Sequence, residues 1–367
     1  MKDVILHLPS WLTTATHNAV PKPPAKVTVF YFITGNPGLI GYYEEFLDFV
    51  TKGRKGRECI VAGASLGGFE IQSNTPTTAT TIEARLCEEL ICPEGFKGKD
   101  IYDLQNQINL SYTRLAKLIE TLTKQFEVVK DVPFQVLLAG HSVGAYIALE
   151  LVRLQHEASV LMSAPVEPQF SIAATFLLTP TIHNISESSS GRIATPVLGY
   201  LPFLPSILQL GTSGLTTILP MPWLRGIVMR ATGMKSAKAV DTTAGFLRTP
   251  GAVKQALYMA GCEMREIGED RWTEEVWGVV DAAKPGEGAG IETSWKSPKH
   301  YFLFAKEDHW VADVTRNAIV NSMWGKATVL VDVDKELGLV HAWCLQQNNV
   351  VAGIVNEWID EILGNES

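Results

Sequence analysis

The feature that most constrains this chain is a serine in a short turn between two segments of different character. The turn is Gly140-His141-Ser142-Val143-Gly144, which matches the pattern G-x-S-x-G. Residues 134–139 before it form a continuous apolar run, as in a buried strand, and residues 145–155 after it have helical spacing. Small residues on both sides of the serine allow a strained strand-to-helix turn that exposes the hydroxyl. The turn therefore requires a buried strand directly before a helix.

Strand-like and helix-like segments alternate along much of the chain. Continuous apolar or β-branched runs predict strands at 26–33, 59–64, 158–162, 300–305 and 327–331, and helical spacing predicts helices at 42–51, 104–126 and 349–363. Hydrophobic residues make up 46% of the chain and charged residues 19%, which is enough apolar material for a large core. The alternation predicts an α/β fold with a mostly parallel central sheet and helices on both faces.

Charge and cysteine content exclude several classes of protein. The net charge of −8 gives no basic stripe with which to neutralise phosphates, so nucleic acid is not an expected partner. The five cysteines are scattered, which predicts neither a disulfide framework nor a zinc site and favours a reducing compartment. The first 20 residues lack the basic and apolar regions of a signal peptide.

One long segment departs from the alternation. Between Ile193 and Leu224 there is no charged residue, yet five prolines interrupt the segment and exclude a single straight transmembrane helix. Two apolar arms at 197–210 and 215–224, joined by residues 211–214, predict a helical hairpin that inserts into a membrane surface, with Arg225 and Arg230 placed to meet lipid headgroups. The alternative is an apolar lid packed on the substrate pocket. Both interpretations predict an apolar substrate.

Two serines match the same pattern, and their surroundings distinguish them. Gly63-Ala64-Ser65-Leu66-Gly67 is followed by further glycine and a polar stretch, with no helix in register. Ser142 has both the strand and the helix, whose amino-terminal amides stabilise negative charge. We therefore predict that Ser142 is the nucleophile and that Ser65 is a tight-turn residue.

A serine nucleophile needs a histidine base and an acid that orients it, in the chain order serine, acid, histidine. Asp308 follows the predicted strand 300–305 and is the predicted acid, with Glu307 in reserve. His341 lies in a loop before the last helix and is the predicted base. The remaining histidines near these positions are interpreted as structural or packing residues, namely His141, His300 and His309.

An oxyanion hole needs two amide donors near the nucleophile. Val143, the residue after the serine, is one predicted donor. The other comes from the turn Gly35-Asn36-Pro37-Gly38 after the first predicted strand, where Pro37 has no amide hydrogen and Asn36 is therefore the predicted donor. A plain β-turn is the alternative interpretation of this segment.

These motifs together resemble a known family. The turn at 35–38, Tyr42-Tyr43, Phe46 and the serine motif extended to Tyr146 are similar to the lipid droplet-associated hydrolase family of α/β-hydrolases. The resemblance includes Asp308, His341 and an apolar insertion before that acid. It implies an α/β-hydrolase fold, a serine hydrolase acting on sterol esters or other neutral lipids, and residence on lipid droplets and the endoplasmic reticulum.

The combined expectation is a single α/β-hydrolase domain over 1–367. Its core spans 26–168 and 291–367, and the insertion 169–290 serves as lid and membrane-surface anchor on the cytosolic side. Ser142 attacks an ester carbonyl, His341 transfers the proton, and neither a metal nor an organic cofactor is required. Thioesterase or acyltransferase activity is an alternative, because both share the acyl-enzyme intermediate. A droplet-binding protein of this fold with little or no catalysis is another.

Overall fold

The computed structural model describes residues 2–13, 24–71, 82–91, 93, 96, 101–161, 170–201, 203–278, 296–323, 329–334 and 336–364. Within them a seven-stranded sheet has the order β1-β3-β2-β4-β5-β6-β7. The strands are β1 Val4–His7, β2 Val27–Ile33, β3 Ile60–Ala64, β4 Phe134–His141, β5 Phe170–Leu178, β6 Lys299–Phe304 and β7 Val329–Val333. Among these described strands, only β1 pairs antiparallel with its neighbour; the other pairs are parallel. The predicted mostly parallel sheet is confirmed.

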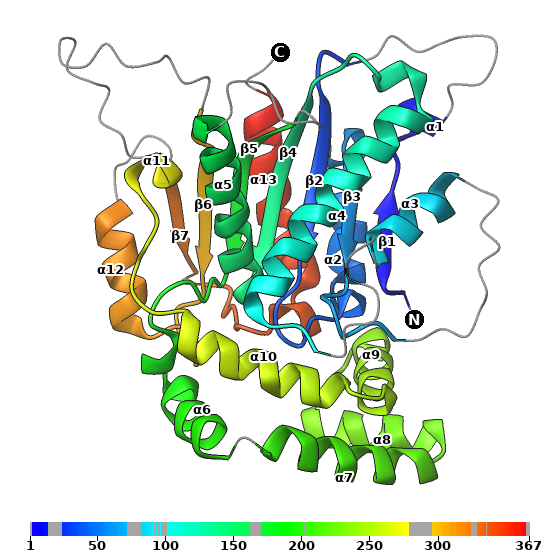
Figure 1. Cartoon of the computed structure of the whole chain (residues 1–367), viewed down its shortest axis with the longest axis vertical. Helices are drawn as coiled ribbons and strands as arrows, with labels where there is room; N and C mark the ends of the chain where they lie inside the picture. The colour runs from blue at the N-terminus through cyan, green and yellow to red at the C-terminus, as the bar shows by residue number, and fades with distance from the viewer. Residues whose placement is uncertain are drawn as a thin grey trace.

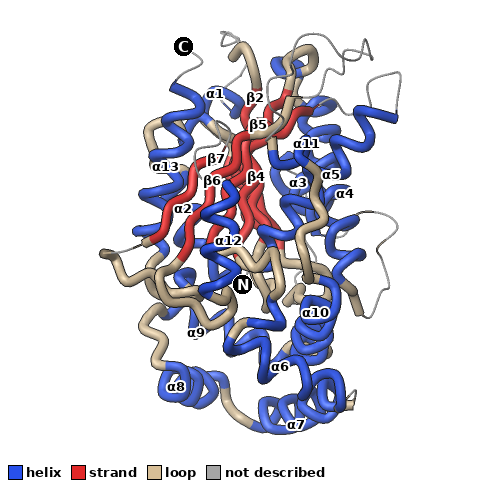
Figure 2. Tube along the Cα trace, turned by 90° about the vertical axis from the view of Figure 1, so that its left-hand side faces the viewer, coloured by secondary structure: helices blue, strands red, loops and turns tan. Residues whose placement is uncertain are grey.

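Helices cover both faces of this sheet and one of its ends (Figure 1). The α-helices are α1 Ser10–Thr13, α2 Glu44–Val50, α3 Ile82–Ile91, α4 Leu104–Gln125, α5 Val143–Leu161, α6 Ser189–Tyr200, α7 Leu204–Ile218, α8 Met221–Thr232, α9 Ala237–Arg248, α10 Ala252–Glu266, α11 Glu274–Trp277, α12 Asp313–Met323 and α13 Asn348–Gly364. Short 3₁₀ helices are η1 Ile40–Tyr43, η2 Gly56–Glu58, η3 Glu127–Val129, η4 Ile185–Glu187 and η5 Trp343–Leu345. Figure 2 shows α2 and α13 on one face of the sheet and α3, α4 and α5 on the other.

The register of the central strands fixes where the site forms. Every residue of β2 and β4 is buried, as expected for apolar strands covered on both faces. Ile33 at the end of β2 lies opposite Gly140 near the end of β4, and His141 lies opposite Leu178 at the end of β5. The loops that follow these strands therefore leave the sheet side by side at its carboxyl edge, where α/β folds place ligands.

The strand predicted at 158–162 is wrong over residues 158–161, and Met162 lies outside the described residues. Helix α5 continues to Leu161, and the hydroxyl of Ser159 donates to the carbonyl of His156 one turn earlier. A short apolar run at the end of a helix has the composition of a short strand, so periodicity alone does not separate the two.

The fifth strand lies inside the region predicted to be inserted. Phe170–Leu178 pairs with β4 and β6 in the middle of the sheet, so the predicted start of the insertion at 169 is wrong. The helices α6 to α10 follow this strand and extend beyond the carboxyl edge (Figure 1). The boundary positions 168/169 and 290/291 and the first two residues of the predicted strand 327–331 lie outside the described residues.

The apolar segment is helical, but its turns differ from the prediction. Residues 211–214, predicted to join two arms, lie within α7, where the Thr212 hydroxyl donates to the Leu208 carbonyl. The helices begin instead at prolines: Pro205 lies in the first turn of α7 and Pro222 in that of α8. Proline is favoured at that position because the missing N–H has no helical partner there, so the prolines set the boundaries and the glycines do not.

Large apolar side chains on α6, α7, α8 and their junctions face solvent. The exposed fraction is 85% for Tyr200, 75% for Phe203 and 84% for Ile218; the others include Ile193, Leu201, Ile207, Leu210, Leu215, Trp223, Ile227 and Met229. We call this set the apolar face. In the described part of the chain no single helix is long and apolar enough to cross a membrane; α6 with residues 204–216 reaches that length and character only as a pair bent by 95°.

Candidate active site

The serine turn adopts the strained geometry that its sequence predicts. Ser142, between β4 and α5, has a positive φ of 55°, which costs a non-glycine residue about 1–3 kcal/mol. A Cβ atom on Gly140 would lie 2.2 Å from the carbonyl oxygen of Gly144, and one on Gly144 would lie 2.3 Å from that of Ile33. Glycine is therefore required at both positions because backbone passes too close for any side chain.

Ser142, His341 and Asp308 form a continuous hydrogen-bonded chain. The Oγ of Ser142 is 3.0 Å from Nε2 of His341, and Nδ1 of His341 is 2.8 Å from Oδ2 of Asp308. The acid lies in the loop after β6 and the histidine in the loop before η5. Side chains separated by up to 199 positions thus meet at the carboxyl edge of the sheet. A base that contacts a hydroxyl and is oriented by a carboxylate is the arrangement that activates a serine for nucleophilic attack.

Backbone amides hold the Asp308 carboxylate. Its Oδ1 accepts hydrogen bonds from the amides of Trp310 and Val311, at 2.7 and 3.2 Å. Burial on its own raises the pKa of Asp308, but the hydrogen bond with His341 and these two amides outweigh it and hold the pKa below its usual value. The reserve acid Glu307 is exposed to solvent, so the structure brings Asp308 to the histidine.

His141 does more than fill space. Its Nε2 lies 2.8 Å from the carbonyl oxygen of His341, and its Nδ1 lies 2.7 Å from the hydroxyl of Tyr43. Burial lowers the pKa of His141 to about 3, so the ring is neutral at pH 7. A neutral ring carries one proton, and only an Nε2–H can donate to a carbonyl, so Tyr43 donates to Nδ1. Neither this role of His141 nor the hydrogen bonds of Tyr43 are predicted from the sequence.

His300, His309 and Ser65 make contacts that stabilise the fold. His300 lies in β6, with its ring nitrogens at 2.7 Å from the Thr175 hydroxyl and 2.9 Å from the Val276 carbonyl. His309 is exposed, and its carbonyl accepts from α6. Ser65 is buried after β3, where its hydroxyl donates to Asp3 and accepts from the amide of Ile40. None of these contacts joins the Ser142 chain.

The turn after β2 passes directly beside the serine. A Cβ on Gly35 would lie 3.1 Å from Cβ of Ser142, and the Gly35 amide donates to the Tyr43 hydroxyl at 3.1 Å. The next residue, Asn36, is joined to Pro37 by a cis peptide bond. Val143 is the first residue of α5, where backbone amides have no partner within the helix. Asn36 and Val143 are therefore both close to Ser142, and their role as oxyanion donors stays a prediction.

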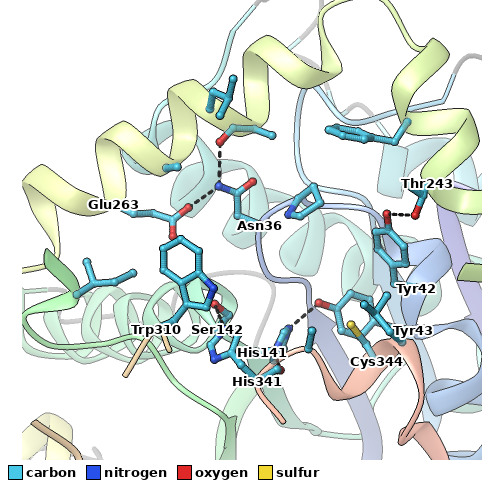
Figure 3. A pocket seen from close by; sticks show the side chains of 18 of the residues that line it. Asn36, Tyr42, Tyr43, His141, Ser142, Thr243, Glu263, Trp310, His341 and Cys344 are labelled. Carbon is cyan, nitrogen blue, oxygen red and sulfur yellow. Dashed lines mark hydrogen bonds between the residues drawn. The ribbon is translucent and has the colours of Figure 1, made fainter. Parts of the chain in front are cut away.

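The Asn36 side chain connects this turn to the helices beyond the sheet. Its Nδ2 donates to Oε1 of Glu263 at 2.8 Å and to the carbonyl of Ala256 at 3.0 Å, both on α10. Figure 3 shows Asn36 and Glu263 on the side of the cavity toward α10, with Ser142 and His341 opposite. Glu263 is a site residue that the sequence analysis missed. Its spacing of four and eight residues from the buried Met259 and Gln255 places it on the buried stripe of the helix, which was the available signal.

A cavity of about 470 Å³ lies above Ser142 and His341. Most of its wall is apolar and comes from α9, α10 and the loops at the carboxyl edge; these residues include Ile185, Met234, Phe246, Leu247, Leu257, Met264, Trp310 and Leu345. Besides the groups already described, the Tyr42 hydroxyl contacts the wall residue Thr243 at 2.8 Å. The cavity therefore suits an apolar ligand of drug-like size with its reacting group at the serine. In the described residues no group of three histidine, cysteine or carboxylate side chains could hold a metal ion.

The fold and this site define the chain as an α/β-hydrolase. A family model described as lipid-droplet associated hydrolase matches residues 26–344. The chain belongs to that family, and the family resemblance of the sequence motifs is confirmed. A lipid droplet-associated hydrolase of Gallus gallus is 26% identical over 91% of this chain and 85% of its own length, and one of Rattus norvegicus is 25% identical over 96% and 90%.

Solved structures resemble the chain more distantly. An esterase of Thermogutta terrifontis covers 92% of this chain and 90% of its own, with a TM-score of 0.47 and 12% identity. E-2-(acetamidomethylene)succinate hydrolase covers 91% and 92%, with a TM-score of 0.49 and 11% identity. These values carry no information about the substrate of this chain.

Proposed function

We propose that this hydrolase is a serine esterase that uses Ser142, His341 and Asp308. Ser142 attacks the ester carbonyl while His341 accepts its proton, and His341 then gives that proton to the departing alcohol. Asp308 orients His341, and the amides of Asn36 and Val143 donate to the oxyanion. Water then attacks the carbonyl of the acyl-enzyme while His341 accepts its proton. His341 returns that proton to the Ser142 oxygen as the carboxylic acid leaves. The observation that carries the proposal is the hydrogen-bonded chain of 3.0 and 2.8 Å at the floor of the cavity.

The proposed substrate is the ester bond of a neutral lipid, of the sterol ester or acylglycerol class. Two observations support this class: the cavity wall is mainly apolar, and the family is associated with lipid droplets. An acyl chain or a sterol ring gains about 25 cal/mol for each Å² of apolar surface that leaves water, so such a wall favours these ligands over polar esters. The reaction needs no metal or organic cofactor, since the side chains supply the nucleophile, the base and the acid.

The insertion is proposed to act both as a lid and as an anchor on the surface of a lipid droplet or of the endoplasmic reticulum, from the cytosolic side. Its helices α9 and α10 form part of the cavity wall, and α6 to α8 bear the apolar face. Arg230 is exposed beside that face, whereas Arg225 pairs with Asp241 of α9 at 2.6 Å. A single domain over 1–367 remains the proposed organisation.

Turnover of a lipid emulsion tests the proposed activity. We expect purified protein to release fatty acid from an emulsion of cholesteryl oleate or triolein, and expect Ser142→Ala to abolish release while Ser65→Ala retains it. Release of acid from a thioester but from neither emulsion would favour the thioesterase alternative, and transfer to an added sterol acceptor would favour acyl transfer. Emulsion binding without any acyl chemistry would favour the droplet-binding protein.

A further inference from the structure

The inference concerns Glu263, the acid that α10 presents to the turn after β2, and it rests on the proposed function. Glu263 is 95% buried by area, since only 5% of its surface is exposed, and it lines the cavity above Ser142. No ion pair in the described part of the chain includes it, and the Asn36 side chain donates to its Oε1 at 2.8 Å. A buried carboxyl without a cation is costly, so its place in the cavity wall calls for an explanation beyond stability.

The two contacts of the Asn36 side chain fix its conformation. Both acceptors, Oε1 of Glu263 and the carbonyl of Ala256, lie on α10, and they face the same Nδ2 (Figure 3). A side chain held at two points restricts the backbone of its own residue, including the direction of the Asn36 N–H. The turn is also held from the opposite side, because the Gly35 amide donates to Tyr43. Oxyanion donors act only when they are held within a few tenths of an ångström of the productive position.

We infer that Glu263 is a positioning residue: by accepting the hydrogen bond of the Asn36 side chain, it holds the Asn36 backbone amide where that amide donates to the oxyanion. The inserted helix α10 thereby completes the catalytic site instead of only covering it. Loss of the Glu263 carboxyl should reduce the rate of the chemical step and leave binding of the ground-state ester almost unchanged, because the oxyanion forms only during the reaction.

The ionisation state of Glu263 supplies a second readout. Burial raises the pKa of Glu263 to about 8, against the smaller opposing effect of the Asn36 hydrogen bond. Below that pH the side chain is neutral, and above it a negative charge beside the oxyanion opposes the reaction. Other titratable groups of the cavity wall are shifted out of this range or belong to the catalytic chain: burial raises the pKa of Tyr42, Tyr43 and Cys344 and lowers that of His141, and His341 is the base.

Charged groups on the elements packed against α10 point to other partners. The elements packed against α10 include α7, which has no charged residue, η4 with Glu187 and α6 with Arg192, and both of these side chains are exposed. On α9, Lys238 contacts Glu44, Asp241 contacts Arg225, and Arg248 contacts the Leu219 carbonyl. On α4, Arg114 contacts Glu70, and Glu120 pairs with both Lys117 and Lys124. Asp103 caps α4, and Lys254, Arg265 and Glu266 are on α10 itself. None of these contributes to the pKa of Glu263.

Steady-state kinetics with a soluble fluorogenic butyrate ester test the inference without a lipid surface. We expect Glu263→Leu and Asn36→Ala each to lower kcat by about tenfold to a hundredfold with KM changed less than about threefold, and expect the double variant to be no slower than the slower single variant. Glu263→Gln keeps the acceptor and should stay within about threefold of the unmodified protein at pH 7. Above pH 8 the unmodified protein should lose kcat and Glu263→Gln should not.

Controls separate this inference from the proposed function. Glu266→Leu, an exposed position on the same helix, should leave kcat unchanged, and melting temperatures are measured for every variant. If Glu263→Leu unfolds, Asn36→Ala and the pH profile of Glu263→Gln decide the question. An unchanged kcat in Glu263→Leu or in Asn36→Ala would overturn the inference about Glu263 but not the proposed function. The same holds if the double variant loses kcat by the product of the two single losses. No hydrolysis by the unmodified protein and no reaction of Ser142 with a phosphonate would overturn the proposed function, and the inference with it.

Discussion

At the scale of single residues, the site depends on contacts that the sequence motifs do not predict. His141 joins the carbonyl of His341 to the hydroxyl of Tyr43, and Tyr43 in turn accepts from the Gly35 amide. One buried imidazole therefore connects the loop that carries the base with the turn that carries the proposed oxyanion donor. The connection requires a neutral ring, which burial provides by lowering the pKa of His141 to about 3.

Acid should weaken the fold through His141. The ordinary pKa of 6.5 applies to the unfolded chain and the value of about 3 to the folded one, so the unfolded chain binds more protons between these values. The contribution to stability is complete above pH 6.5 and is lost as the pH falls toward 3, by at most about 1.4 kcal/mol per pH unit for one proton. We expect His141→Phe to unfold at a lower temperature at pH 7 but to show a smaller drop between pH 7 and pH 5.

The exposed histidine provides the control for this titration. His309→Phe should leave the drop in melting temperature between pH 7 and pH 5 as large as in the unmodified protein, because the hydrogen bonds that join His341, His141 and Tyr43 do not involve His309. An unchanged drop in His141→Phe would show that His141 does not titrate on unfolding in this range.

The two neighbouring acids should differ sharply in their effect on catalysis. Asp308→Asn keeps the size of the side chain but removes the charge that orients His341, and we expect kcat to fall by about a thousandfold to ten-thousandfold. Glu307→Gln, one position earlier on the exposed side of the loop, should change kcat less than twofold. Steady-state hydrolysis of the soluble butyrate ester measures both. Equal losses in the two variants, or none in either, would contradict the assigned acid.

At the scale of elements, local sequence predicted the strands of the core better than the helices beyond it. The runs predicted at 26–33, 59–64 and 134–139 overlap β2, β3 and β4, strands in which every residue is buried. The predictions for residues 158–161 and 211–214 are wrong because a short apolar run and a glycine-containing stretch are both compatible with a helix when tertiary packing supports it. Strand β5 is not predicted from the sequence. Its pairing with β4 and β6 in the sheet, and not the spacing of its own residues, identifies it as a strand.

The apolar face should control attachment to lipid surfaces. Phe203→Asp with Ile218→Asp places two charges where we propose that α7 and the preceding turn contact lipid, and we expect binding to a triolein and phospholipid emulsion to weaken at least about tenfold. Flotation of the emulsion measures the bound fraction. Point substitutions are preferable to deletion of residues 197–224, because α7 also packs against α9 and α10 and its loss would disturb the cavity.

Another well-exposed apolar residue, outside the apolar face, is the control for this experiment. Val314 on α12 is 68% exposed and does not belong to the apolar face, so Val314→Asp should bind the emulsion as the unmodified protein does. Undiminished binding of the double variant, with the soluble-ester kcat also unchanged, would contradict the proposed anchor.

At the scale of the whole molecule, three layers follow one another from the sheet outward. The carboxyl edge of the sheet carries the serine, the acid and the histidine. Helices α9 and α10 lie beyond that edge, and α6 to α8 lie beyond them (Figures 1 and 2). Many large apolar side chains of α6 to α8 are exposed to solvent. Sequence order and strand context predicted the first layer, because each of its residues follows a strand or opens a helix. The Glu263 contact was not predicted, because no sequence motif links Glu263 to Asn36, 227 positions away in the chain.

The central claim is that Ser142 is an activated nucleophile, and covalent labelling tests it without knowledge of the lipid. Purified protein is exposed to a fluorescent fluorophosphonate with and without a lipid emulsion, beside Ser142→Ala and Ser65→Ala, and the modified peptide is identified by mass spectrometry. We predict that the unmodified protein and Ser65→Ala are labelled at Ser142 and that Ser142→Ala is not labelled. Labelling lost only in Ser65→Ala, or no labelling of the unmodified protein in either condition, would contradict the account.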